Sequence, residues 1–328
     1  LIDTTRKQND LDDLYGIFFE DLNHAADGGL YAELIQNRSF EFDKIDNADY
    51  HALTAWECVE DDGTADFHIE TADPVSGKNP HYLVIDIRQP GKNVGICNTG
   101  YNTGIPLKKG ETYYFTCFAK RGNPEEELEV SLRSREGKTY THAGFTVKTD
   151  WTKTELSLVS PVTDTCARLA VTIKGKSRAA LDFISLFPAD TYKGRRNGLR
   201  KDLAQLLEDM QPKFLRFPGG CLVHDGSLDP EDRNSMYRWK NTIGPLWERP
   251  ARRNNWGYNQ TLGLGFYEYF QLCEDIGARP IPVLPGGYDP HHQRIVPLEE
   301  LEPWVADALD LIEFANGDAR TTKWGSVR

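Results

Sequence analysis

The stretch "KFLRFPGGCLVHDG" (213–226) contains an apolar run that ends at Pro-Gly-Gly, and "RPIPVLPGGYDPHH" (279–292) repeats this pattern further along the chain. A segment with helical periodicity precedes each run, which predicts strands in parallel βα units. The active site of a βα barrel lies at the carboxyl ends of its strands. Glycine at such an end lets backbone approach a ligand and adopt positive φ. The alternative is a tight turn that needs glycine for steric reasons alone.

The composition limits the classes of partner. The 328 residues leave room for two domains, and the formal net charge of −12 comes without a basic block. This charge disfavours nucleic acid and anionic membrane as partners and suits a neutral ligand. The six cysteines form no CxxC pair. Disulfides among Cys58, Cys97, Cys117 and Cys166 are possible, but scattered buried thiols are the favoured interpretation.

Three regions differ in pattern. Residues 1–48 contain "LYGIFF" (14–19), which predicts a buried strand, and "DGGLYAELIQNRSFEF" (27–42), a glycine-led segment with helical character. Residues 49–189 hold short β-branched and aromatic runs separated by turn signals, which predict an antiparallel β-sandwich of the jelly-roll kind. Residues 190–328 alternate helix and strand and predict a continuation of the βα units.

Residues 190–328 contain signals for three helices. "NGLRKDLAQLLEDM" (197–210) predicts a helix capped by Asn197, and "GFYEYFQLCEDIG" (265–277) predicts one that Gly277 ends. A third predicted helix covers 298–317. Its expected apolar face consists of Leu301, Trp304, Val305, Ala308 and Ile312.

The count of parallel strands is incomplete. Strands at 14–19, 213–217 and 280–284 make three, whereas a closed (β/α)₈ TIM barrel needs eight strands and about 250 residues. We therefore predict a partial barrel of about three βα units with an inserted sandwich, and we expect the rest of the barrel to be missing from this chain.

Candidate site residues lie at the predicted strand ends. Glu20 directly follows the first apolar run, where a carboxylate can bind sugar hydroxyls or transfer protons, or be merely solvated. Cys221 is followed by His224 and Asp225, but this spacing does not establish a triad, so packing or ligand contact is favoured over cysteine hydrolase chemistry. "YDPHH" (288–292) favours a solvated loop over a metal site. No metal site and no cofactor are predicted.

A long loop at 236–260 is rich in aromatic residues, and one or two of them are expected to touch a ligand, because aromatic faces suit carbohydrate rings. The aromatic residues of this loop are Tyr237, Trp239, Trp247, Trp256 and Tyr258.

Three separated segments, "LYGIFFEDLNHAADGGLYAELIQNRSFEF", "NGLRKDLAQLLEDMQPKFLRFPGGC" and "YRWKNTIGP", together resemble glycoside hydrolase family 51, the α-L-arabinofuranosidases. The resemblance covers roughly residues 10–45 and 190–328 and indicates the N-terminal portion of such an enzyme. The region between them resembles carbohydrate-binding modules of the family 4/9 type. "VHDG" and "LPGGYDPHH" depart from the family pattern, which bears on substrate preference more than on reaction class.

The resemblance implies a retaining hydrolase that removes terminal α-L-arabinofuranosyl groups from arabinoxylan, arabinan or their oligosaccharides. Retention uses two glutamates about 5–5.5 Å apart. The family places its acid/base in a Gly-Asn-Glu motif after the fourth strand, so both catalytic glutamates are expected outside this chain, in its remaining C-terminal part.

Within this chain, the resemblance implies substrate-binding roles for five residues. Glu20 matches the glutamate that hydrogen-bonds arabinose, and Cys221, which follows Gly219 and Gly220, matches a residue that lines the sugar subsite. Trp239 falls in the loop that shapes the rim.

We predict an extracellular or periplasmic location. The alternatives are a non-catalytic carbohydrate-binding protein and a related barrel glycosidase that acts on another sugar.

Overall fold

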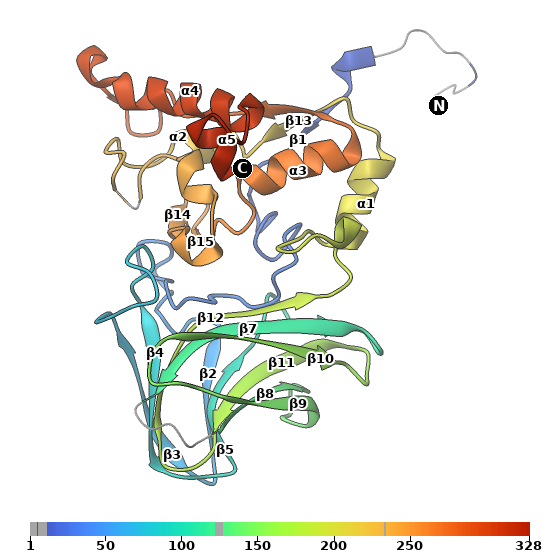
Figure 1. Cartoon of the computed structure of the whole chain (residues 1–328), viewed down its shortest axis with the longest axis vertical. Coiled ribbons are helices and arrows are strands. Elements are labelled where there is room, and N and C mark those ends of the chain that lie inside the picture. Colours follow the sequence, from blue (N-terminus) through green and yellow to red (C-terminus); the bar gives the residue numbers. More distant parts are fainter. Residues whose placement is uncertain (1–4, 6–11, 122–126, 233) are drawn as a thin grey trace. The chain divides into compact units, whose positions relative to one another are not determined.

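A computed structural model of the chain describes residue 5 and residues 12–121, 127–232 and 234–328 (Figure 1). The described residues form two compact units that alternate along the sequence. Unit 1 contains the described residues up to Asn23 together with Asp202–Ile243 and Leu264–Arg328. Unit 2 contains His24–Lys201 and Gly244–Gly263. The domain boundaries drawn from the sequence stay a prediction.

Unit 1 is built on a three-stranded parallel sheet in the order β1-β13-β16. Ile17 pairs with Leu215, and Leu215 pairs with Pro280. The second and third strands were predicted from their apolar runs and are confirmed as parallel neighbours. The strands of this sheet are β1 (Ile17–Phe18), β13 (Phe214–Phe217) and β16 (Arg279–Pro282).

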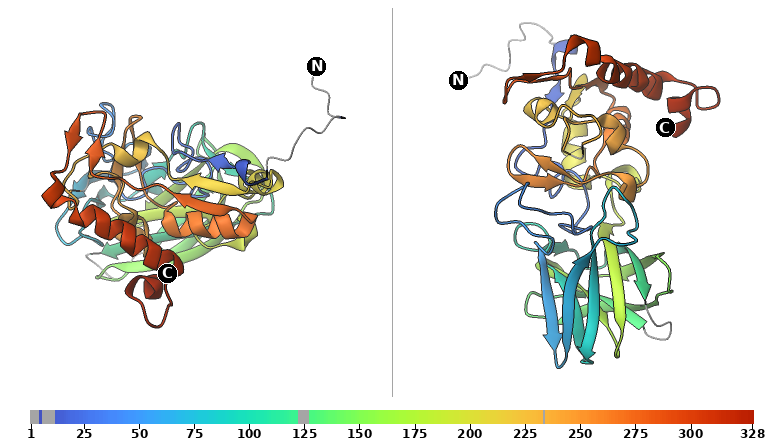
Figure 2. Two further views of the ribbon diagram at one scale, coloured as in Figure 1. Left: turned by 90° about the horizontal axis from the view of Figure 1, so that it is seen from above. Right: turned by 90° about the vertical axis from the view of Figure 1, so that its left-hand side faces the viewer.

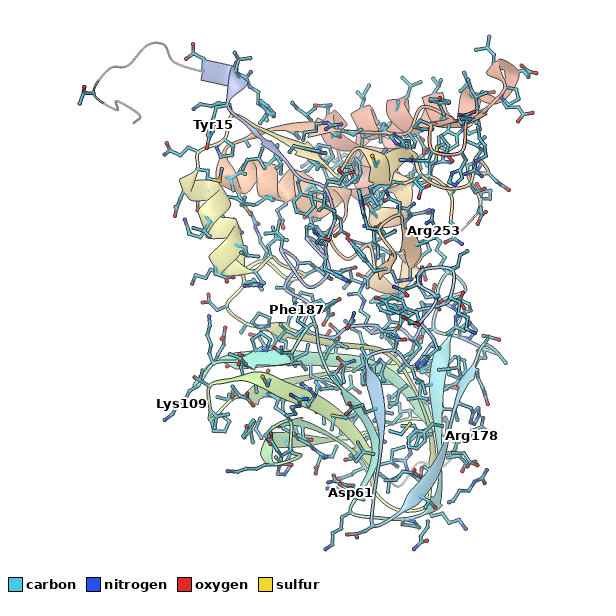
Figure 3. All side chains as sticks on the ribbon, turned by 180° about the vertical axis from the view of Figure 1, so that it is seen from behind. Tyr15, Asp61, Lys109, Arg178, Phe187 and Arg253 are labelled. Atoms are coloured by element: carbon cyan, nitrogen blue, oxygen red, sulfur yellow. The ribbon has the colours of Figure 1, made fainter. Side chains whose placement is uncertain are left out.

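The first strand departs from its prediction. A buried strand over 14–19 is wrong in both length and burial, since β1 has two residues and Phe18 is 50% exposed. Tyr15, labelled in Figure 3, lies just before it. The physical reason is that β1 stands at the edge of the sheet and has a partner on one side only among the described strands.

Helices and a small hairpin complete unit 1. Its α-helices are α1 (Lys201–Asp209), α2 (Cys221–His224), α3 (Phe266–Ile276), α4 (Glu302–Asn316) and α5 (Lys323–Val327). Its 3₁₀ turns are η1 (Asp12–Leu14), η3 (Trp239–Thr242) and η5 (Leu298–Glu300). The hairpin pairs β17 (Tyr288–Asp289) with β18 (Arg294–Ile295).

Both ends of α3 are explained by local chemistry. At its start the Gly265 N–H donates to Glu268 Oε2 over 3.0 Å, and the Phe266 N–H donates to Thr242 Oγ1 over 2.9 Å. At its end Gly277 has φ of 70°, the left-handed conformation predicted for this cap. On its buried side Tyr269 stacks on Phe217 of β13, with ring centroids 4.7 Å apart.

Two helix predictions are corrected. Asn197 does not cap α1, which begins at Lys201; instead Asn197 accepts a hydrogen bond from the Tyr31 hydroxyl. The buried face of α4 is also rotated from the predicted one. Trp304 is buried as expected, but Val305 and Ile312 are largely exposed. The residues of α4 that the structure buries are Trp304, Asp307, Leu311 and Phe314.

Unit 2 is mainly a β-sandwich of two antiparallel sheets (Figure 2). One sheet has the order β10-β7-β12-β4-β3, and the other has the order β2-β5-β11-β8-β9, with β6 paired to β11. The strands are β2 (Trp56–Asp61), β3 (Thr64–Glu70), β4 (Tyr82–Gln89), β5 (Asn93–Asn98), β6 (Ile105–Leu107), β7 (Thr112–Arg121), β8 (Glu127–Arg133), β9 (Thr139–Thr146), β10 (Thr152–Val159), β11 (Asp164–Ile173) and β12 (Arg178–Pro188).

Alternation of apolar and polar residues explains the sandwich. In β7 every second residue is buried, because successive side chains of a strand point to opposite faces. Six sequence runs predicted strands here, and they correspond to β4, β7, β8, β10, β11 and β12. The solvent face carries ion pairs such as that of Arg178 (Figure 3) with Glu70 at 2.5 Å. Unit 2 also holds η2 (Tyr192–Gly194), η4 (Leu246–Glu248) and the hairpin of β14 (Arg252–Asn254) and β15 (Tyr258–Gln260).

The segment 27–42 is not helical, contrary to the sequence prediction. It runs along β12, where the Leu34 N–H donates to the Leu186 carbonyl over 3.0 Å. The buried Glu33 carboxylate accepts from the Leu186 N–H at 2.9 Å and pairs with Arg38 at 3.5 Å. Burial raises the pKa of Glu33, and these partners oppose that shift. Contacts with the sandwich therefore override the local helical tendency.

All six cysteines are free, as predicted, but the prediction that they are buried is wrong for Cys58, Cys166 and Cys221. Cys97, Cys117 and Cys273 are buried, and burial raises the pKa of each thiol. Such thiols are poor nucleophiles and act as small apolar groups.

Candidate functional site

Glu20 connects the first two strands of the parallel sheet at their carboxyl ends. It lies two residues after β1, and its Oε1 accepts hydrogen bonds from the Gly220 N–H at 2.7 Å and the Leu222 N–H at 3.2 Å. Its other oxygen, Oε2, accepts no hydrogen bond from any residue that the structure describes. Glu20 therefore has one oxygen fixed by backbone and one that can accept from a ligand hydroxyl.

Gly219 allows this arrangement. A Cβ at position 219 would lie 2.8 Å from Glu20 Cγ and 2.9 Å from Glu20 Oε1, closer than such atoms pack. At Gly220 the same added atom would have its nearest neighbour at 3.7 Å. The first glycine of this Pro-Gly-Gly is thus required by the close approach of a side chain, which combines the functional and the steric interpretations of the motif.

Cys221 and His224 lie on the short helix α2, which begins directly after this turn. They are three residues apart, so both side chains face the same side of one helical turn. Both are partly exposed. Burial, followed by the nearby His291, lowers the pKa of His224, while Asp289, Asp225 and Glu20 oppose the shift. His224 therefore favours its neutral form.

The second Pro-Gly-Gly leads into the β17–β18 hairpin. Gly287 has φ of 74°, and a Cβ on Gly286 would meet no atom within 4 Å. The turn of the hairpin carries His291, whose Nε2 lies 3.2 Å from His224 Nε2. His291 was not predicted to join the site. The signal for it was present in the sequence, since "YDPHH" and Cys221 follow the ends of two strands that are neighbours in the sheet.

Trp239 is enclosed in the core of unit 1. Its side chain is 0% exposed, and its Nε1–H donates to the Asp307 carbonyl over 2.8 Å. The ring packs against Phe314 and Trp324, with centroids 5.2 and 5.1 Å away. A ring enclosed in this way supports the fold of unit 1 and offers no face to a sugar, so we do not retain it among the proposed ligand contacts.

The other aromatic residues of the 236–260 loop are divided between the core and the surface. Tyr237 and Tyr258 are buried, whereas Trp256 is exposed. Tyr258 stacks on His24 with ring centroids 4.0 Å apart. The aromatic content of this loop therefore reflects packing more than ligand binding.

Comparisons with known proteins identify relatives of this chain. Residues 206–328 match the model of the alpha-L-arabinofuranosidase 1 domain, and residues 32–179 match that of a carbohydrate binding domain. The whole chain is 44% identical to an extracellular exo-alpha-L-arabinofuranosidase of Streptomyces chartreusis, covering 39% of that protein. It is 38% identical to alpha-L-arabinofuranosidase 1 of Arabidopsis thaliana, covering 96% of this chain and 46% of that one.

A solved structure is also similar to the chain over almost all of its length. The arabinose-bound MgGH51 α-L-arabinofuranosidase superimposes with a TM-score of 0.84 at 32% identity, over 96% of this chain and 50% of that one. Over 96% of its length or more, the chain is thus similar to α-L-arabinofuranosidases, among them the family 51 structure. It spans about half the length or less of these relatives, between 39% and 50% of each.

The chain thus brings four of its five predicted site residues together. Glu20, Gly219, Gly220 and Cys221 meet at the ends of β1 and β13, while Trp239 is enclosed in the core. Among the described residues, no helix is both long enough and apolar enough to span a bilayer.

Proposed function

We propose that the protein carrying this chain removes terminal non-reducing α-L-arabinofuranosyl residues from arabinoxylan, arabinan or their oligosaccharides. Similarity to these α-L-arabinofuranosidases supports the reaction class, and the position of Glu20 supports a sugar site in this chain. A carboxylate with one fixed oxygen and one open oxygen suits recognition of a neutral pentose, because its open oxygen can accept from ring hydroxyls.

The proposed roles of the site residues follow from their positions. Glu20 orients the arabinose through Oε2, and its Oε1 is held by the backbone N–H groups of Gly220 and Leu222. Gly219 and Gly220 leave room beside Glu20, and Cys221 contacts the sugar from the first turn of α2. These residues bind and orient the substrate, and the bond-breaking carboxylates are supplied elsewhere.

The two glutamates of the retaining reaction are proposed to lie outside residues 1–328. In that reaction a carboxylate attacks the anomeric carbon, and a carboxylic acid protonates the departing oxygen; water then releases the sugar from the carboxylate. The length of the relatives, of which this chain covers between 39% and 50%, leaves room for these residues.

The same comparison supports a proposal for the architecture. The parallel order β1-β13-β16 and the helices that precede β13 and β16 suit the first three βα units of a (β/α)₈ barrel. We propose that residues 1–48 and 190–328 form this partial barrel, and that residues 49–189 form a jelly-roll sandwich. The remaining strands of the barrel would come from the rest of the protein.

Replacing Glu20 by glutamine tests the proposed sugar contact. Gln can still accept from the Gly220 N–H but loses the charge that strengthens a hydrogen bond to a sugar hydroxyl. Hydrogen bonds to charged groups contribute about 1.5–3 kcal/mol, so kcat/KM on p-nitrophenyl α-L-arabinofuranoside is expected to fall roughly 10- to 100-fold.

Glu299→Gln is the matched control, because the Glu299 side chain is exposed and makes no hydrogen bond or ion pair with any described residue. It is expected to keep wild-type kcat/KM. Equal kinetics for Glu20→Gln and Glu299→Gln, with unchanged circular dichroism, would contradict the assignment of Glu20.

A second candidate function is glycan binding by the sandwich, which the carbohydrate-binding model over residues 32–179 favours. Among the described large apolar side chains of the sandwich sheets, Tyr114 on β7 is 52% exposed and is the candidate aromatic contact. Affinity electrophoresis on arabinoxylan, comparing the protein with Tyr114→Ala, tests this function. Wild-type retardation of the variant would argue against binding at this face.

An extracellular location is part of the proposal, as the name of the Streptomyces relative suggests.

A further inference from the structure

Three metal-ligating side chains converge beside the proposed sugar site. Cys221, His224 and His291 each direct one ligand atom into a space where all three atoms lie within 4.8 Å of one another. Apart from the imidazole contact of 3.2 Å, these side chains have no ion pair or hydrogen bond with any described residue. The cluster is thus partly exposed, and its ligand atoms have no other hydrogen-bonding partner among the described residues.

Two elements hold the cluster in place. Cys221 and His224 occupy one face of α2. His291 lies in the β17–β18 turn, where its N–H donates to Asp289 Oδ1 over 2.9 Å. The hairpin is tied to the loop after α2, because Arg294 Nη2 donates to the Gly226 carbonyl over 2.6 Å. The third ligand is therefore brought to the first two by a braced hairpin.

The distances suit a small tetrahedral ion. Zinc bonds of about 2.0–2.1 Å place two ligand nitrogens about 3.3 Å apart, close to the 3.2 Å between the two Nε2 atoms. One thiolate and two imidazoles form a ligand set that favours zinc-like ions over calcium or magnesium. Three protein ligands leave a fourth position for water or another ligand.

We propose that Cys221, His224 and His291 bind a zinc-class divalent cation. On binding, the Cys221 thiol releases its proton to solvent and coordinates as thiolate, while each imidazole coordinates through a ring nitrogen that carries no proton. No metal was predicted here from the sequence, because Cys221 and His291 are separated by 70 positions and meet only through the parallel pairing of β13 and β16.

A neighbouring cluster shows why the proposal is restricted to these three residues. Asp225, Asp289 and His292 also converge, but Arg294 Nη2 lies 2.6 Å from Asp289 Oδ2 and already supplies the positive charge. His292 Nδ1 lies 2.7 Å from the same oxygen. This second cluster is an ion-pair network that stabilises the hairpin.

The metal site has a consequence for the proposed function, and this consequence rests on that function. Cys221 cannot contact a pentose while it coordinates a metal, so zinc and arabinose are expected to compete. Metal binding itself is independent of whether the protein hydrolyses arabinosides.

Direct metal binding is the test. The protein carrying this chain, reduced with a phosphine and freed of metal, is titrated with ZnCl₂ by calorimetry and with CoCl₂ by absorption. We expect one equivalent of each ion and a thiolate-to-cobalt charge-transfer band. Cys221→Ser is expected to abolish the band. His291→Ala is expected to weaken zinc affinity by more than about tenfold, because even changes to residues that only support metal ligands cost that much.

Cys58→Ser and His142→Ala are matched controls, since both residues are exposed and lie in the sandwich. Both are expected to bind as wild type. Unchanged affinity in Cys221→Ser and His291→Ala, or no binding by wild type, would overturn the metal site. If zinc binds but added arabinose does not weaken it, the competition is overturned while the metal site stands.

Discussion

The two Pro-Gly-Gly turns of the parallel sheet have the same tripeptide and different structural roles. In the first turn Gly219 is pressed against Glu20, and the Gly220 N–H donates to that carboxylate. In the second turn a Cβ added to Gly286 would have no atom within 4 Å. The next residue, Gly287, adopts φ of 74° just before the β17–β18 hairpin. A shared motif after neighbouring strands therefore does not imply a shared role.

Asp289 anchors the hairpin that follows the second turn. The largest effect expected here is a loss of folding stability when acid protonates this carboxylate. Burial alone would raise the pKa of Asp289, but hydrogen bonds from Arg294 and His292 lower it to about 2, from an ordinary value of 3.8. Because the folded state has the lower pKa, the stabilisation is present above about pH 4 and is lost as pH falls through about 2. The pKa difference corresponds to about 2 kcal/mol of the free energy of unfolding.

Denaturant unfolding of wild type and Asp289→Asn between neutral pH and about pH 2 measures this contribution. The variant cannot titrate at this position, so its stability is expected to be lower at neutral pH and to fall less in acid. Parallel acid curves for the two proteins would show that Asp289 does not anchor the hairpin.

Gly219→Ala tests the crowding at the first turn. Its Cβ would displace the Glu20 side chain, so kcat/KM on an aryl α-L-arabinofuranoside is expected to fall roughly tenfold, corresponding to about 1.4 kcal/mol. Gly286→Ala, the equivalent change in the second turn, is the control and is expected to leave kcat/KM unchanged. If both variants lose activity equally, the two turns do not differ as described.

Gly287→Ala tests the backbone conformation of the second turn and has the smallest expected effect. A left-handed conformation costs a non-glycine residue about 1–2 kcal/mol, and the added Cβ would also lie 3.0 Å from Leu301 Cδ2. Thermal unfolding is expected to show about 1 kcal/mol of lost stability for Gly287→Ala and less than about 0.5 kcal/mol for Gly286→Ala. Equal melting temperatures would indicate that the turn relaxes.

Much of the fold could be predicted from local sequence. The alternating run of β7 gave its strand directly, because a half-buried strand has a period of two. The runs of β4 and β12 are short, apolar and almost continuously buried, a pattern that is also typical of strands. The end of α3 was equally clear, since Gly277 is the residue type that a left-handed cap requires. The strand β13 followed from an apolar run between Pro212 and Pro218.

Other features could not be predicted, because they depend on distant neighbours. The 27–42 segment has residues that favour a helix, but Glu33 is held by the backbone of β12. Trp239 is of a residue type that often packs against sugar rings, yet its ring is enclosed by Phe314 and Trp324. Periodicity alone also misplaced the buried face of α4, because which side of a helix is covered depends on what packs against it.

The sequence by itself determined six strands of the sandwich and the strands β13 and β16 of the parallel sheet, and a family resemblance implied sugar-binding roles for Glu20 and Cys221. The strands follow from periodicity and turn chemistry, both of which are local. Only the tertiary structure decided that Gly219 packs on Glu20 and that His291 meets His224. Both contacts join residues far apart in sequence, and only the pairing of β13 with its neighbours brings them within reach.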